Sequence, residues 1–276
     1  MVHPVRLGLV TVLAISLAGI GNSGAKIAVR IDHVTLSSMV EKPATPGSVT
    51  WVAIRQTISP GWHTYWKNPG DSGLPTMISW ILPTGMIAGA AIWPTPERFT
   101  TDSIVNFGYR GAATMFVPIT LSPKAVPGVI KAKISLLECG HICIPEEASL
   151  DFDLRRSFGQ QKQFTEARAN IPQMFPGSAR VSTNQGNVVL TLNGAVLKRA
   201  RSNEVQFYPA TPFVIDYGTK PAARFTNGEL ELVFRPASFP KAFRTFSGVI
   251  VIAGIGSYDI AAGKKASSSV TSTTKP

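Results

Sequence analysis

Residues 130–136 read IKAKISL and residues 150–155 read LDFDLR, and in both stretches every second side chain is apolar. Side chains of a β-strand alternate between its two faces, so this pattern predicts strands with one face in a core and one in solvent. Similar runs, separated by segments rich in Pro, Gly, Asn and Ser, occur at residues 27–31, 49–58, 116–121, 188–192, 205–208, 230–234 and 249–253. Many short strands with such punctuation predict an all-β protein built from sandwiches.

One stretch has a different pattern and divides the chain. Residues 160–170 (QQKQFTEARAN) contain good helix formers without alternation, and Pro172 and Pro176 follow them. We therefore predict a first β-sandwich domain at residues 26–158, a linker with a short helix at 159–176, and a second β-sandwich domain at 177–263. The polar, low-complexity tail at residues 264–276 is expected to be disordered.

The first twenty-five residues have the features of a secretory signal. Arg6 precedes an almost wholly apolar run at residues 7–20, and small residues at 23–25 offer a cleavage site. The run is about 14 residues long, whereas a helix needs roughly 20 to cross a bilayer. We therefore expect cleavage near Ala25 and export of the mature chain to the periplasm.

The charge balance invites a nucleic-acid interpretation, which the distribution of charges does not favour. The chain has 27 Lys and Arg against 16 Asp and Glu, a formal net charge of +11. The basic residues are scattered, and no motif that reads base edges is found. We expect a solvated basic surface and no nucleic-acid partner, while an anionic membrane surface or an acidic protein partner stays open.

Two cysteines stand close together in the segment Cys139-Gly-His-Ile-Cys143. In an oxidising compartment such a pair can form a disulfide. Closing so short a loop removes little entropy from the unfolded chain, on the order of 2 kcal/mol, and the small ring restrains disulfide geometry. These points favour a thiol–disulfide exchange centre over a staple. A permanent structural disulfide remains an alternative.

His141 lies between the two cysteines and allows two further interpretations. It could join Cys139 and Cys143 as a ligand of zinc or copper, but alternate residues of an extended chain point in opposite directions and no fourth ligand is evident. It could instead tune the thiols, because a nearby imidazolium lowers a thiol pKa. An exposed loop histidine without a role is an equal alternative, and we predict no metal and no cofactor.

Residues 61–76 (GWHTYWKNPGDSGLPT) form a second conspicuous segment, with three large aromatic residues among turn formers. We expect Trp62, Tyr65 and Trp66 to cover one end of a sandwich core. Such residues also anchor protein interfaces, so a binding surface is the alternative. No Gly-x-Ser-x-Gly elbow is present, so His63 is not expected to serve a hydrolytic triad.

Four segments carry a family resemblance: GWHTYWKNPGDSGLPT at residues 61–76, WPTPERF at 93–99, VNFGYRG at 105–111 and LLECGHICIPEEASLDFDL at 136–154. Together they resemble the N-terminal periplasmic domain of the DsbD thiol:disulfide interchange proteins, in particular the branch that contains ScsB, a copper-tolerance relative. The resemblance covers roughly residues 26–263, and the cysteine segment is its most specific part. It implies immunoglobulin-like sandwiches.

The resemblance also implies roles for individual residues. Cys143 matches the cysteine that forms the mixed disulfide with partners, and Cys139 matches the one that resolves it. The family shields its cysteines with an aromatic cap, and Phe107, with Tyr109 two residues on, matches that place. Carboxylates beside the cap are not evident, because Val105 and Asn106 precede Phe107.

The function expected from these features is a periplasmic protein-disulfide reductase, an electron relay that passes reducing equivalents to thioredoxin-like or other thiol–disulfide oxidoreductases. A full family member continues into a membrane domain and a thioredoxin-like domain, which this sequence lacks. We therefore expect a separate membrane transporter as the electron source. The alternative is a non-catalytic binding or accessory protein of copper tolerance or cytochrome c maturation, with a structural disulfide.

Overall fold

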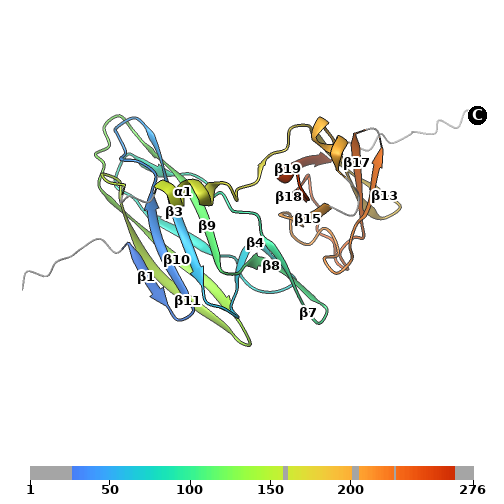
Figure 1. The fold of residues 1–276 in the computed structure, drawn as a ribbon, viewed down its shortest axis with the longest axis horizontal. Helices are drawn as coiled ribbons and strands as arrows, with labels where there is room; N and C mark the ends of the chain where they lie inside the picture. The colour runs from blue at the N-terminus through green and yellow to red at the C-terminus, as the bar shows by residue number, and fades with distance from the viewer. Residues whose placement is uncertain (1–26, 158–160, 201–204, 227, 265–276) are drawn as a thin grey trace, which may run out of the picture.

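The computed structural model describes residues 27–157, 161–200, 205–226 and 228–264 (Figure 1). The predicted signal segment lies outside this range, and so does the predicted tail apart from its first residue. None of the described helices is long and apolar enough to cross a membrane. The predicted fold class is confirmed: the chain is all-β, with two tandem domains and a short helix between them.

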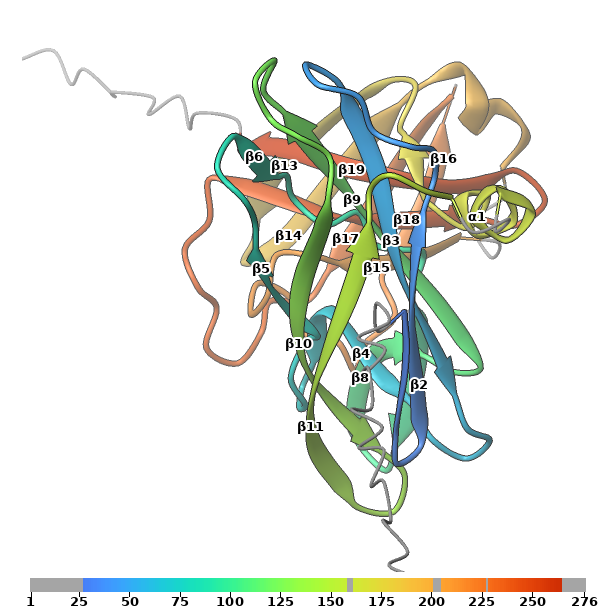
Figure 2. The same cartoon turned by 90° about the vertical axis from the view of Figure 1, so that its left-hand side faces the viewer.

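The first domain is a sandwich of short sheets. Its strands are β1 (Ala28–Ile31), β2 (Val34–Val40), β3 (Val49–Ile58), β4 (Thr64–Gly70), β5 (Met77–Ile81), β6 (Met86–Ala88), β7 (Glu97–Thr101), β8 (Ile104–Tyr109), β9 (Ala112–Leu121), β10 (Val129–Cys139) and β11 (Cys143–Asp153). One sheet has the order β1-β2-β3-β9-β6, and a second has the order β11-β10-β5. Figure 2 shows these two layers, with β5, β10 and β11 on one side and β2 and β3 on the other. A third, small sheet, β4-β8-β7, extends one end of the sandwich.

The alternation in β10 and β11 decides which side chains enter the core. Ile130 pairs with Phe152 and Ala132 pairs with Leu150, and all four are buried. The residues between them in sequence carry the charges and lie nearer solvent, as the period of two requires. The end of this hairpin, where the cysteines lie, is therefore fixed by a well-packed stem.

The second domain contains the remaining strands. These are β12 (Gln173–Met174), β13 (Ser178–Asn184), β14 (Asn187–Asn193), β15 (Val205–Pro209), β16 (Ala222–Thr226), β17 (Glu229–Phe234), β18 (Thr245–Ile252) and β19 (Gly256–Lys264), with the 3-10 helix η1 (Ala195–Arg199) after β14. They pair continuously in the order β15-β18-β19-β13-β14-β17-β16, and β12 adds to β19. Phe207 of β15 nevertheless contacts Phe234 of β17, with ring centroids 5.3 Å apart. The sheet therefore folds over itself around its own core.

The predicted linker helix is α1 (Gln161–Arg168), and it packs against the first domain. Phe164 meets Phe116 of β9 edge-to-face, with ring centroids 4.8 Å apart. The Arg168 guanidinium lies 3.3 Å from the Glu41 carboxylate. Figure 1 shows α1 across β3 and β9. The linker is thus attached to the first sandwich before the chain enters the second domain.

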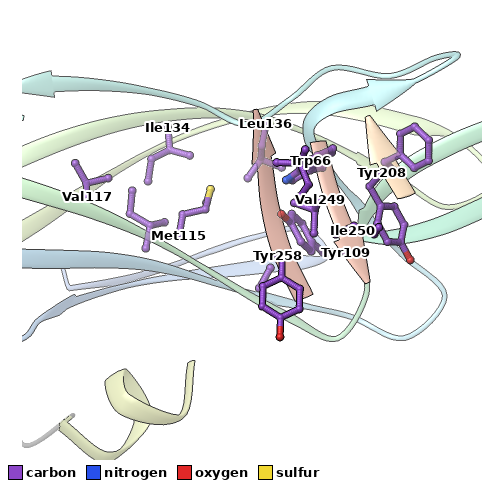
Figure 3. Packing of buried hydrophobic residues seen from close by; sticks show 14 of the residues in the cluster. Trp66, Tyr109, Met115, Val117, Ile134, Leu136, Tyr208, Val249, Ile250 and Tyr258 are labelled. Carbon is purple, nitrogen blue, oxygen red and sulfur yellow. The ribbon is translucent and has the colours of Figure 1, made fainter. Parts of the chain in front are cut away.

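The two domains share buried contacts on the side of β4 and β8. The Asn68 side chain donates a hydrogen bond to the carbonyl of Pro209 at 2.7 Å, and Arg98 donates one to the carbonyl of Tyr217 at 2.7 Å. Figure 3 shows buried side chains running from Leu136 in the first domain past Trp66 to Val249 in the second. The second domain therefore supports the small sheet at the end of the sandwich.

Candidate functional site

Cys139 ends β10, Cys143 begins β11, and the two residues pair directly across the hairpin and are joined by a disulfide. The loop between them is short, and the Gly140 N–H donates to the Ile142 carbonyl at 2.9 Å. Cys139 is only 2% exposed, whereas Cys143 is exposed. A partner can therefore reach the Cys143 sulfur, while the Cys139 sulfur is covered.

The start of the aromatic segment covers Cys139. The His63 N–H donates to the Cys139 carbonyl at 2.9 Å, and the Cys139 N–H donates to the His63 carbonyl at 3.0 Å. This pair of bonds forms an antiparallel bridge just before β4. Because side chains two residues apart on an extended chain share a face, His63 and Tyr65 point to the same side.

Tyr65 contacts the disulfide itself. Its hydroxyl donates to Cys139 Sγ at 3.1 Å and lies 4.0 Å from Cys143 Sγ. Burial raises the pKa of Tyr65 above its usual range, so the hydroxyl keeps its proton at neutral pH. A neutral, buried O–H is thus aimed at the covered sulfur.

His63 continues this line of polar groups. Its Nε2 lies 3.3 Å from the Tyr65 hydroxyl oxygen. Burial, and then the positive charge of Arg110, lower the pKa of His63, so the ring is neutral at neutral pH. When Tyr65 donates to the sulfur, its oxygen can accept from the Nε2–H tautomer of His63. The three groups then form a directed chain from His63 through Tyr65 to Cys139.

A glycine makes room for the Tyr65 ring. Gly73 has a φ of +90°, a conformation that other residues rarely adopt, and a Cβ placed there would collide with the ring of Tyr65. The turn around it is fixed by Asn106, whose Nδ2 donates to the Ser72 carbonyl at 2.7 Å. The dense turn-forming residues of this segment therefore position Tyr65 against the disulfide.

The structure brings Phe99, not Phe107, to the cysteine end of the domain. The Phe99 ring on β7 lies 5.0 Å from the His63 ring, and the Arg110 guanidinium lies 4.3 Å above Phe99. Phe107 on β8 is buried and packs edge-to-face on Tyr217 of the second domain, at 5.3 Å. Among the described residues, no ring contact or hydrogen bond joins Phe107 to either cysteine.

The other two residues expected to tune the site also lie apart from the sulfurs. The Tyr109 hydroxyl is buried and donates to the Pro94 carbonyl at 2.9 Å, and burial raises its pKa well above the usual range. His141 is exposed at the tip of the hairpin. Neither side chain has a hydrogen bond to a cysteine within the described part of the chain.

Sequence reasoning therefore found the cysteines but missed their neighbours. The aromatic segment was expected to cover a core, and Trp66 does so, since it is fully buried. The contact of Tyr65 with the sulfurs was not expected. The available signal was the spacing of His63 and Tyr65, which places two polar rings on one face. Nothing in the sequence pairs that face with Cys139.

Comparison with known proteins relates this part of the chain to a described family. Residues 36–154 match the family model described as the N-terminal domain of the thiol:disulfide interchange protein DsbD. The matched range spans most of the first domain, from β2 to the end of β11. All four segments that carried the resemblance begin after residue 36 and end by residue 154, so the matched range includes the disulfide, Tyr65 and Phe99.

Two solved structures extend the comparison. The N-terminal periplasmic domain of ScsB from Proteus mirabilis is 20% identical with a TM-score of 0.67, and the match covers 88% of this chain and all of that one. The DsbD n-terminal domain of Neisseria meningitidis in the reduced form is 16% identical with a TM-score of 0.31, covering 45% of this chain and 87% of that one. A search of curated proteins gives no match. The ScsB domain thus shares the fold of both domains described above.

Proposed function

We propose that the Cys139–Cys143 pair is a thiol–disulfide exchange centre that passes two electrons to disulfides of protein partners. The observation that carries this proposal is the asymmetry of the pair. Cys143 is exposed and Cys139 is buried beneath Tyr65. The attacking cysteine must be exposed to reach a partner's disulfide, whereas the resolving cysteine can stay buried until the mixed disulfide has formed. The match of residues 36–154 to the DsbD N-terminal family model supports the same chemistry.

The exchange proceeds in two balanced steps. In the reduced protein the Cys143 thiolate attacks one sulfur of the partner's disulfide, and the partner's other sulfur leaves as a thiolate. The Cys139 thiolate then attacks Cys143 Sγ, which restores the Cys139–Cys143 disulfide and releases the second partner thiolate. The partner takes up two protons as its disulfide is reduced, and this pair is oxidised by two electrons.

Tyr65 acts as a positioning residue in this scheme. Its O–H donates to Cys139 Sγ, so in the reduced protein it stabilises a thiolate on Cys139 and lowers the pKa of that thiol. The His63 ring polarises the hydroxyl from the other side. The resolving cysteine is thereby kept ionised while a mixed disulfide forms on Cys143.

Phe99 takes the place of the aromatic cap. Its side chain is 6% exposed and packs against the His63 ring, and the His63 backbone is hydrogen-bonded to the Cys139 backbone. β7 is the edge strand of the small sheet, so a movement of β7 would uncover His63 beside Cys139. Because Cys143 is already exposed, this cap shields only the Cys139 side of the disulfide, and docking of a cognate partner would open that side.

The partners we propose are thioredoxin-like proteins or other thiol–disulfide oxidoreductases of the periplasm. The electrons would come from a membrane-embedded thiol–disulfide transporter. The exposed Ile142 beside Cys143, 65% exposed, gives such a partner an apolar contact next to the reactive sulfur. This location requires the export that residues 1–25 predict.

The experiment is a trapping assay with two single-cysteine variants. Cys139→Ser and Cys143→Ser proteins are reduced and mixed with a purified thioredoxin-fold protein in its disulfide form. Cys139→Ser should accumulate a mixed disulfide through Cys143, because the resolving thiol is gone. Cys143→Ser should give little adduct, because Cys139 is covered. Equal adduct with both variants, or with neither, would contradict the assigned roles.

A further inference from the structure

Three carboxylates from different segments meet at the cysteine end of the first sandwich. Asp32 lies in the turn between β1 and β2, Glu138 immediately precedes Cys139 on β10, and Glu146 follows Cys143 by three residues on β11. One carboxylate oxygen from each lies within 4.8 Å of the others. Asp32 is exposed and Glu146 is partly buried. None of the ion pairs in the described part of the chain involves these residues.

The strand register explains why two of these acids face inward. Glu138 pairs with Ile144 and Leu136 pairs with Glu146, so Glu138 and Glu146 are diagonal neighbours on one face of the hairpin. Leu136 on that face is buried in the core. The β1–β2 turn, which carries Asp32, closes the end of the sandwich over this face.

Glu138 is the unusual member of the group. It is 0% exposed, and its Oε1 accepts a hydrogen bond from the His33 N–H at 3.2 Å. Its Oε2 is also buried and has no hydrogen-bond partner among the described residues. A buried, unpaired carboxylate oxygen is costly unless a cation or another donor meets it.

The donor set indicates the kind of cation. All three ligands are carboxylate oxygens, which hard divalent cations prefer. Ca²⁺ takes roughly six to eight oxygen ligands in flexible geometry, whereas Mg²⁺ demands near-ideal octahedral geometry, keeps several of its waters and usually binds through only one or two carboxylates. A group of three protein carboxylates therefore suits Ca²⁺, and the exposed side of Asp32 leaves positions for water.

We propose that Asp32, Glu138 and Glu146 bind one divalent cation of the size of Ca²⁺ beside the disulfide. The ion joins both arms of the β10–β11 hairpin to the β1–β2 turn. Because Glu138 adjoins Cys139, the ion holds the end of β10 in place when the disulfide is open. This inference does not depend on the direction or the partners of the exchange reaction.

The test is calcium binding by the oxidised mature protein after treatment with a chelator. Calorimetric titration with CaCl₂ at constant ionic strength should give one site, with a dissociation constant on the order of 10⁻⁴ to 10⁻³ M, as in extracellular modules. At about tenfold excess over that constant, the melting temperature should rise by roughly 3 °C. Mg²⁺ at the same concentration should give a smaller rise.

Two variants separate the site from general surface charge. Glu146→Gln should lose the calcium-dependent rise, and Asp32→Asn should weaken it. Glu147→Gln is the matched control, because Glu147 is the next residue on β11, is exposed and faces away, accepting from Ser135 Oγ at 3.4 Å. It should respond like the wild type. The site would be overturned if the wild type gave neither binding heat nor a shift in melting temperature, or if Glu146→Gln and Glu147→Gln responded equally to Ca²⁺. A rise with Mg²⁺ equal to the rise with Ca²⁺ would overturn the assigned ion size.

Discussion

The Tyr65 hydroxyl lies 3.1 Å from Cys139 Sγ and 4.0 Å from Cys143 Sγ, so a single phenol contacts both sulfurs of the disulfide. The bond is directed at the buried sulfur, which is the resolving one in the proposed exchange. In the oxidised protein the hydroxyl meets a weak acceptor. After reduction it meets a thiolate, to which hydrogen bonds are stronger. The contact therefore favours the reduced, ionised state of Cys139.

Tyr65→Phe should raise the pKa of the Cys139 thiol. A hydrogen bond to a charged group is worth about 1.5–3 kcal/mol, which corresponds to a shift of about 1–2 pKa units. The pKa of the Cys139 thiol is measured in the reduced Cys143→Ser protein from the ultraviolet absorbance of the thiolate as a function of pH. Tyr208→Phe is the control, because it removes a hydroxyl that bonds Gln206 in the second domain. A pKa unchanged by Tyr65→Phe would show that the hydroxyl does not act on the thiolate.

Gly73→Ala should displace the Tyr65 ring and destabilise the domain. The added Cβ meets the ring, and the φ of +90° is unfavourable for alanine, with a cost of about 1–3 kcal/mol for the backbone alone. Gly111→Ala controls for the backbone term, because Gly111 also has a positive φ, +64°, but open space where its Cβ would lie. Denaturant unfolding and the Cys139 pKa measure the effects. Only Gly73→Ala should change both quantities, and parallel behaviour of the two variants would contradict the steric account.

Phe99→Ala should let small thiols reach the disulfide more easily. Loss of the ring uncovers His63 and the Cys139 side of the site, so the rate of reduction by glutathione should rise several-fold. Phe107→Ala is the matched comparison, with the same truncation on the neighbouring strand. It should destabilise the protein by about 3–5 kcal/mol, because Phe107 is buried against Tyr217, yet leave the reduction rate of the folded protein nearly unchanged. A faster reduction of the Phe107→Ala protein, with an unchanged rate for Phe99→Ala, would assign the cap to Phe107 instead.

His63 should make stability depend on pH in a defined direction. Its pKa in the folded protein is below the ordinary value of 6.5, because burial and Arg110 disfavour the charged ring. The unfolded chain therefore binds the proton more readily, and the free energy of unfolding is greatest above pH 6.5 and falls as the pH drops toward the lowered pKa. His63→Gln should flatten this part of the profile in denaturant titrations at several pH values. A wild-type profile that falls no more steeply than the variant's over this range would refute the assignment.

Much of the fold could be predicted because its signals are local. The alternation in residues 130–136 and 150–155 gives both the strands and their buried faces, and the break at residues 160–170 gives α1. The same alternation, continued two residues past Leu136, reaches Glu138. It could have identified that acid as buried. The continuous pairing in the second domain could not be foreseen, because strand order depends on contacts between distant segments.

The neighbours of the disulfide could not be predicted for a similar reason. Phe99 pairs with Asn106 and Phe107 pairs with Arg98, so the two phenylalanines occupy successive positions of one hairpin and point to opposite faces. Which face meets the cysteines depends on how β8 joins β4. The β-bridge between His63 and Cys139 joins residues 76 positions apart in sequence, and the sequence around either residue does not indicate this pairing. A resemblance of motifs was therefore enough to expect a cap and not enough to choose its residue.

The central claim is that the disulfide exchanges under physiological conditions, and its reduction potential tests this most directly. The mature protein is equilibrated in glutathione buffers of known potential, and the fraction of free Cys139 and Cys143 is read by alkylation and mass. We predict a potential within the span of known exchange proteins, roughly −120 to −270 mV. A value below about −300 mV would mark a structural disulfide and contradict the proposed relay.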